Sequence, residues 1–189
     1  MPIKPQGVIH RRHSIKTMKS VDGWQAKAFR GMVAVGEVVT APTRDSAILV
    51  VKRQLDEAAA KQRTMRGVDG FPTVEEVRAA LPHLKCNKAQ DAMLAAHLHA
   101  PDHVLTATQL AQAAGYDDYV VANAQYGQLG RALAEELDWE PQEKTAGKTV
   151  WTFTLATDAD GKAREEGEEI AGHWRWKLRP EIAAALSSR

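Results

Sequence analysis

Five polar side chains between residues 119 and 137 have the chemistry needed to recognise the edges of nucleic-acid bases. They are Asn123, Gln125, Tyr126, Gln128 and Arg131. Asn and Gln can each form two hydrogen bonds with adenine, and Arg can do the same with guanine. A helix that exposed these residues would therefore be suited to reading DNA. The same side chains could instead support a neighbouring loop or pack inside the protein, and both interpretations stay open at the level of sequence.

The N-terminal region carries the positive charge that a DNA-binding protein needs. Residues 1–70 contain 13 Lys and Arg against 6 Asp and Glu, whereas residues 71–189 contain 12 against 18. Arg11, Arg12, Lys16 and Lys19 fall in the first twenty residues, which contain no acid. We expect residues 1–22 to be a basic, flexible arm whose cations contact phosphates. A solvated tail without a partner is the alternative.

Upstream of the polar set, the sequence predicts a short helix and a tight turn, which together make a helix-turn-helix. Ala111 is small where two helices would touch, and Gly115 suits a left-handed backbone after a helix end. Val121 is expected to fill the corner between the helices. Tyr116 and Tyr119 flank the turn, where they could contact DNA or close the core.

The remaining elements follow from periodicity and capping residues. Alternation and valine content predict strands over residues 23–31 and 32–40, and Thr43 would begin the helix that follows. A glycine-rich linker spans 67–72. Beyond it, the sequence predicts helices capped by Thr73 and Asn87, strands over 150–156 and 173–178, and a final helix with Pro180 at its first position.

These elements predict an α+β protein of two parts. A strand–strand–helix unit over residues 23–66 would pair with itself in a homodimer or pack on the rest of the chain. Residues 73–189 would form a winged-helix domain, in which three helices precede a β-hairpin and the second and third helices make the helix-turn-helix. The hairpin, or wing, would have a long acidic tip, and we count Arg175 on it among the DNA contacts.

Residues 85–187 resemble a known kind of bacterial domain. The shared features are a Gly-Tyr turn, an Ala-Asn-x-Gln-Tyr-Gly-x-Leu-Gly core over residues 122–130 and a closing Trp-x-Trp-x-x-Arg-Pro-Glu segment over 174–181. Similar segments occur beside HNH-type restriction endonucleases, where they form a DNA-recognition domain. The resemblance implies DNA handling in a bacterial or phage defence setting. It implies no nuclease, because the chain lacks the histidine–asparagine cluster and zinc cysteines of an HNH centre.

Several other kinds of chemistry have no support in the sequence. The single cysteine, Cys86, excludes an internal disulfide and a cysteine-rich zinc site. His97 and His99 are two residues apart on an expected helix, which is poor spacing for joint metal binding. We find no phosphate-binding loop, no catalytic motif and no apolar run of about 18 residues that would span a bilayer. We therefore expect a cytoplasmic protein without cofactor, metal or membrane partner.

Three functions remain, in order of preference. The first is a DNA-binding protein of a bacterial or phage defence or counter-defence system, including a reader of modified duplex DNA. The second is a protein-binding module, such as an inhibitor or subunit of a nuclease complex, because acids including Asp117 and Asp118 crowd the C-terminal half. The third is an enzyme acting on modified bases, for which no catalytic residue can be named.

Overall fold

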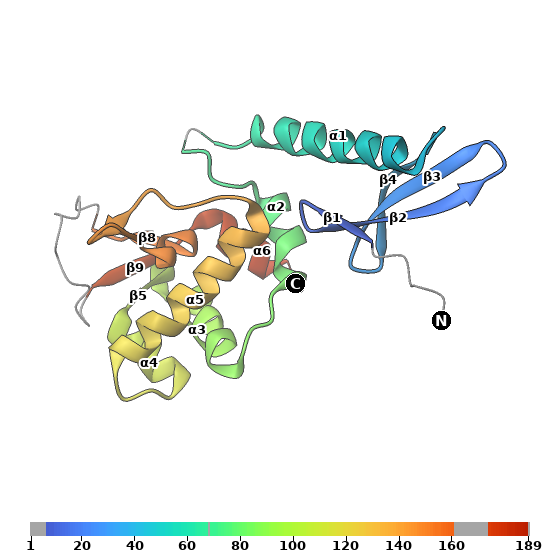
Figure 1. Ribbon diagram of the computed structural model, residues 1–189. Coiled ribbons are helices and arrows are strands. Elements are labelled where there is room, and N and C mark those ends of the chain that lie inside the picture. The colour runs from blue at the N-terminus through green and yellow to red at the C-terminus, as the bar shows by residue number, and fades with distance from the viewer. Residues whose placement is uncertain (1–6, 68, 161–173, 189) are drawn as a thin grey trace. The chain divides into compact units, whose positions relative to one another are not determined.

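The computed structural model describes residues 7–67, 69–160 and 174–188, and the chain divides into two compact units, Met1–Met65 and Arg66–Arg189. The fold is mixed α/β, and each unit has its own hydrophobic core (Figure 1).

The first unit is a four-stranded antiparallel sheet with a helix packed on one face. The strands follow one another across the sheet in chain order, β1-β2-β3-β4. Their bounds are Val8–His10 for β1, His13–Ser20 for β2, Gly23–Arg30 for β3 and Val33–Ala41 for β4, and helix α1 spans Arg44–Arg63. The predicted strands over 23–31 and 32–40 and the helix beginning after Thr43 are confirmed, with Thr43 Oγ1 accepting a hydrogen bond from the Ser46 amide at 3.1 Å.

The prediction of a flexible arm over residues 1–22 is wrong for the part that the structure describes. Residues 8–20 form β1 and β2, and a two-residue turn at Arg11 and Arg12 joins them with positive φ angles of 42° and 60°. β1 and β2 extend the β3–β4 hairpin to a sheet of four strands. A sheet of three or more strands with a hydrophobic face can be stable where a single hairpin is not. The turn is tied to α1, because Asp56 accepts hydrogen bonds from Arg11 and His10. Those bonds, first from Arg11 and then from His10, lower the pKa of the Asp56 carboxyl.

The core of the first unit lies between α1 and one face of the sheet. Arg44 on α1 donates a hydrogen bond from Nε to Thr17 Oγ1 at 3.1 Å, which marks the side of β2 that faces the helix. The buried apolar residues are Ile15, Ala26, Ala28, Val39, Ala47, Ile48 and Val51. Because strand side chains alternate between faces, the residues between these core positions point away from α1.

The second unit contains five α-helices, three short 3₁₀ helices and two small sheets among its described residues. The helices are α2 (Val74–Ala80), η1 (Leu81–His83), α3 (Lys88–His99), η2 (Pro101–His103), α4 (Ala107–Ala114), α5 (Tyr119–Leu137), η3 (Trp151–Thr154) and α6 (Pro180–Ser187). Strands β5 (Val104–Thr106), β8 (Ala156–Asp158) and β9 (Arg175–Leu178) form an antiparallel sheet in the order β5-β9-β8, and β6 (Lys144–Thr145) pairs with β7 (Lys148–Thr149).

Two expectations for this unit need correction. The predicted linker 67–72 belongs partly to the core, because Phe71 is buried and lies 4.1 Å from the Arg179 guanidinium. The predicted strand over 150–156 is mostly the 3₁₀ helix η3, and only Ala156–Asp158 pairs as a strand. The alternation of large side chains there reflects burial of Phe153 and Leu155 rather than a pleated strand. The predicted acidic tip of the wing lies largely outside the described residues.

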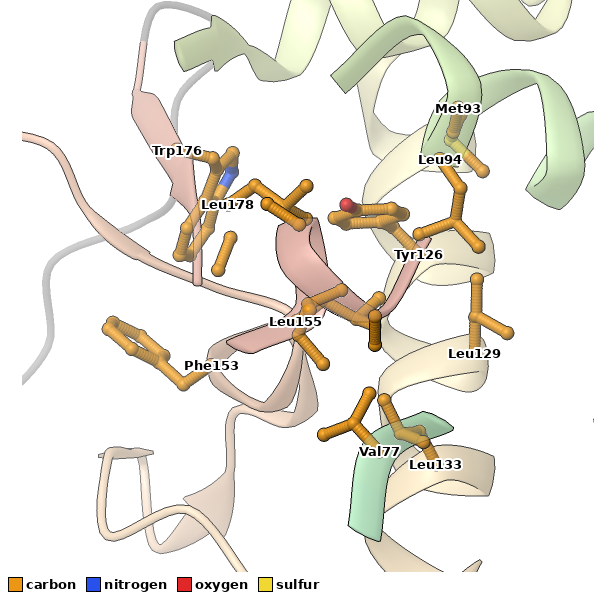
Figure 2. Close-up of a cluster of buried hydrophobic side chains, with 14 of the residues drawn as sticks. Val77, Met93, Leu94, Tyr126, Leu129, Leu133, Phe153, Leu155, Trp176 and Leu178 are labelled. Carbon is orange, nitrogen blue, oxygen red and sulfur yellow. The ribbon is translucent and has the colours of Figure 1, made fainter. Parts of the chain in front are cut away.

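The core of the second unit draws on nearly all of its elements. Figure 2 shows the buried side chains of α2, α3, α5, η3 and β9 pointing toward one another. Trp176 and Tyr126 are the largest fully buried side chains, and the Phe153 ring meets the Trp176 ring edge-on at 5.3 Å. This core fixes which face of α5 remains open to a ligand.

Candidate nucleic-acid interface

Helices α4 and α5 are joined by the tight turn that the sequence predicts. Thr106 begins α4, with its Oγ1 accepting from the Gln109 amide at 3.1 Å, and Gly115 ends it in the left-handed conformation at φ 74°. The Tyr116 amide then bonds to the Ala111 carbonyl at 2.9 Å. Asp118 caps α5 by accepting from the Val120 amide at 2.8 Å. Local hydrogen bonds therefore set where α5 begins.

The expected role of Val121 is wrong. Val121 is 42% exposed, and the neighbouring Ala122 is the residue that is fully buried. The buried face of α5 continues through Tyr126, Leu129 and Leu133, at steps of four, three and four residues. The helix is thus rotated by about one residue from the orientation that the sequence predicts.

Tyr126 was expected among the DNA contacts, and its burial contradicts this. Its hydroxyl donates a hydrogen bond to His97 Nδ1 at 2.8 Å, and His97 Nε2 donates to the Trp176 carbonyl at 3.0 Å. Burial lowers the pKa of His97 to about 4 and raises the pKa of Tyr126. The imidazole is therefore neutral at pH 7, which agrees with one ring nitrogen accepting and the other donating. Tyr126 joins α5 to α3 and β9 instead of facing a ligand.

Gln125 also serves the protein's own structure. Its Oε1 accepts a hydrogen bond from Asn87 Nδ2 at 3.0 Å, and its backbone carbonyl accepts one from Gln90 Nε2 at 3.2 Å. Both partners are at the beginning of α3, where Asn87 is the cap. The side chain is half-buried and holds α5 against α3.

The other three predicted residues of α5 lie together along a groove. Asn123, Gln128 and Arg131 line one side, and the β6–β7 hairpin and η3 form the other. The groove has a volume of about 630 Å³. Its remaining lining residues are Ala124, Gly127, Thr145, Ala146, Lys148, Thr149, Val150, Trp151 and Thr152.

Glycine at two positions of α5 allows η3 to approach this helix. Gly130 packs directly against the Trp151 carbonyl, in a space that no β-carbon could share. A β-carbon at Gly127 would be 3.7 Å from Thr152 Oγ1, which is ordinary contact. Close packing at Gly130 therefore sets the position of η3 beside the exposed face of α5.

The groove is a positively charged feature in an otherwise acidic unit. Residues 66–189 contain 13 Lys and Arg against 19 Asp and Glu, yet the residues that line the groove include Arg131 and Lys148 and no acid. Arg131 is 63% exposed, forms a 3.0 Å ion pair with Glu135 and stands 5.7 Å from the centre of the Trp151 ring. An exposed pair of this kind is weak, so the guanidinium can be shared with a ligand.

The hairpin side of the groove was not predicted from the sequence. The available signal is the repeated Lys-Thr pair around Ala146 and Gly147. Both turn residues have positive φ, at 48° and 74°, as a two-residue hairpin requires. Lys148 and Trp151 thereby join residues of α5 at one site.

The other predicted contacts do not line this groove. Tyr116 and Tyr119 are half-buried and pack against the core. Arg175 is exposed on β9, where its Nη1 lies 2.8 Å from Asp160 Oδ1. The four cations Arg11, Arg12, Lys16 and Lys19 belong to the first unit.

Within the described ranges, no group of three or more His, Cys, Asp and Glu residues is placed to hold a metal ion. Among the same residues, no helix has the length and apolar character needed to cross a bilayer.

Comparison with known proteins adds no relative. No protein-family model matches the chain, and neither the curated proteins nor the solved structures contain a significant match.

Proposed function

We propose that this protein binds duplex DNA through the groove between α5 and the β6–β7 hairpin. The observation that carries the proposal is the acid-free lining, which combines Asn123, Gln128, Arg131 and Lys148. Amide and guanidinium groups can recognise base edges, and the lysine can neutralise a phosphate. Duplex DNA presents both base edges and phosphates, so it could bind the amide and guanidinium groups and the lysine at the same time.

The arrangement of the elements supports the same proposal. In a winged helix, a short strand between the first two helices pairs with the second strand of the C-terminal hairpin. Here β5 lies between α3 and α4 in the chain and pairs with β9, which also pairs with β8. On this interpretation α4 and α5 are the helix-turn-helix, and β8 and β9 are the strands of the wing.

A bacterial or phage defence setting, including recognition of modified bases, is the narrower part of the proposal. It rests on the resemblance of residues 85–187 to domains that accompany HNH-type endonucleases. Asn123 and Gln128 are the groove residues with the donor and acceptor pairs that could distinguish a modified base from a plain one.

The test is a binding series with plain, cytosine-methylated and hypermodified duplexes, measured by fluorescence anisotropy at several salt concentrations. We expect the wild-type affinity to fall steeply with salt, and replacing both Arg131 and Lys148 by Gln to weaken binding about 10-fold or more. The matched control is the double substitution Lys85→Gln and Lys88→Gln, which removes two charges from the same unit outside the groove. Equal effects of the two double variants would refute the groove as the contact surface.

A second candidate function, binding to a protein, is favoured by the beginning of α5. Val120 and Val121 are 56% and 42% exposed, next to Asp117 and Asp118. In a helix-turn-helix, the N-terminal end of the recognition helix usually approaches the bases. Acids at that end would repel the phosphates of DNA. This function predicts that the chain binds one protein partner in a 1:1 complex, that Val120→Ser with Val121→Ser abolishes the complex, and that no duplex is bound.

A further inference from the structure

The face of the first unit's sheet that α1 leaves uncovered has an unusual composition. Antiparallel register places Lys16 directly opposite Lys27 and Met18 opposite Gln25. Lys16 Nζ stands 4.7 Å from the centre of the Phe29 ring, so these three residues share the face. The paired residues of this face are Ile9, Ser14, Lys16, Met18, Gln25, Lys27, Phe29, Ala34 and Thr40.

This face is exposed, and the four strands contain one acid, Glu37, in the irregular part of β4 opposite Lys27. Ile9 is 69% and Met18 is 63% exposed, whereas Ile15, on the opposite face of the same strand β2, is buried against α1. Like charges directly opposite on neighbouring strands destabilise a sheet. Within the described part of the chain, neither Lys16 nor Lys27 has a carboxylate partner. An external anion would relieve this repulsion.

We propose that this uncovered face of the sheet, centred on Lys16, Gln25, Lys27 and Phe29, is a second DNA-binding surface, with the side chains of β2 and β3 on this face entering the major groove. The major groove of B-DNA admits a two-stranded β-ribbon, and β2 and β3 are the two central strands of this four-stranded sheet. Each strand has eight residues and is therefore about 25 Å long, enough to follow the groove across several base pairs.

The side chains of this surface match the chemistry of the major groove. Lys can donate to guanine O6 and N7, Gln can pair with adenine N6 and N7, and an aromatic ring can contact the thymine methyl group. Lys16, Gln25 and Phe29 provide one side chain of each of these three kinds. Lys27, directly opposite Lys16, adds a second cation to the same face.

A second copy of the chain fits this face less well. A two-fold dimer is self-complementary, so the patch of one copy would meet the same patch of the other. The two patches would then bring four lysines together, without an acid from the paired residues of the face. Charge complementarity therefore favours a polyanion such as duplex DNA over a second copy of the chain.

The test compares two double variants of the full chain in binding to a 20-base-pair duplex. Lys16→Gln with Lys27→Gln removes two charges from the face, and Lys52→Gln with Lys61→Gln removes two from α1 in the same unit. We expect the first pair to weaken binding about 10-fold at moderate salt and to reduce the slope of log affinity against log salt by about 2, whereas the control changes affinity less than about 2-fold. Neither pair removes a core contact, so melting temperatures should stay close to the wild-type value.

The outcomes separate this inference from the proposed function. If only the groove variant, Arg131→Gln with Lys148→Gln, loses affinity, the sheet surface is refuted and the groove stands. If only the Lys16 and Lys27 variant loses affinity, the sheet binds DNA and the groove does not. Sedimentation that shows a dimer abolished by Met18→Glu, with wild-type DNA affinity retained, would assign the face to a second copy and overturn the inference.

Discussion

The carbonyl oxygen of Trp151 occupies the place beside Gly130 that a β-carbon would need. This contact joins the middle of α5 to η3 and so sets one wall of the candidate groove. The Gly130 backbone and the Trp151 carbonyl both belong to helices, so neither can rotate away as a side chain could.

Gly130→Ala should therefore destabilise the second unit by about 2–3 kcal/mol, as overpacking of a rigid contact does. Gly127→Ala is the matched control, because its β-carbon would meet only Thr152 Oγ1 at 3.7 Å. Alanine is favoured over glycine in a helix by up to about 1 kcal/mol, so this variant should be as stable as wild type or more stable. Urea unfolding of the two variants measures the difference, and equal stabilities would contradict the close packing at Gly130.

Tyr126→Phe should cost about 1–3 kcal/mol, because it leaves the buried His97 Nδ1 without a hydrogen-bond donor. The ring is retained, so the loss reports the hydroxyl alone. Tyr116→Phe is the control, since Tyr116 is only half-buried and should tolerate the change within about 0.5 kcal/mol. Denaturant midpoints with unchanged m-values give both numbers. A neutral Tyr126→Phe would show that the hydroxyl does not bond to His97.

Local and long-range features of this fold differ in how well the sequence predicts them. The caps at Thr73 and Asn87 were predicted because each depends on residues three positions apart, and both capping boxes are present. The orientation of α5 was predicted one residue away from its true position, because Val121 and Ala122 are both apolar and only the packing partners decide between them. Long-range contacts of this kind leave no local signal.

In the candidate site too, the local features were predicted from the sequence and the long-range contacts were not. The polar character of Asn123, Gln128 and Arg131 was evident from their types, and all three line the groove. Burial of Tyr126 depends on His97, which is 29 residues away, and the second wall depends on a hairpin that was not predicted. The strands over residues 8–20 were missed because apolar and polar residues do not alternate regularly there. Met18 lies on the exposed face, and Lys19 lies on the face that carries Ile15.

The buried His97 should make stability depend on pH. Its pKa is about 4 in the folded protein, whereas a freely hydrated imidazole, as in the unfolded chain, has a pKa of 6.5. The unfolded chain therefore binds the proton first as the pH falls, and folding stability is lost between pH 6.5 and about 4. Above pH 6.5 the contribution is fully present, and the maximum loss from this group is about 3 kcal/mol.

This pH dependence can be measured in two ways. NMR of the histidine ring protons should show His97 titrating near pH 4, and urea unfolding should show stability falling from pH 6.5 toward 4. His97→Gln should remove that part of the pH dependence, even though the variant is less stable at pH 7. A folded-state midpoint near 6.5 would mean that the imidazole is hydrated rather than enclosed.

The proposed groove predicts different effects for its polar and its charged residues. Gln128→Ala should reduce discrimination among duplexes selected from a random-sequence library, by about 1–3 kcal/mol at one base pair, while leaving the salt slope unchanged. Lys148→Gln should weaken binding to all duplexes equally and reduce the salt slope by about 0.9. The two variants are measured on the same selected and random duplexes. If Gln128→Ala instead weakened all duplexes alike, the groove would hold the DNA backbone without reading its bases.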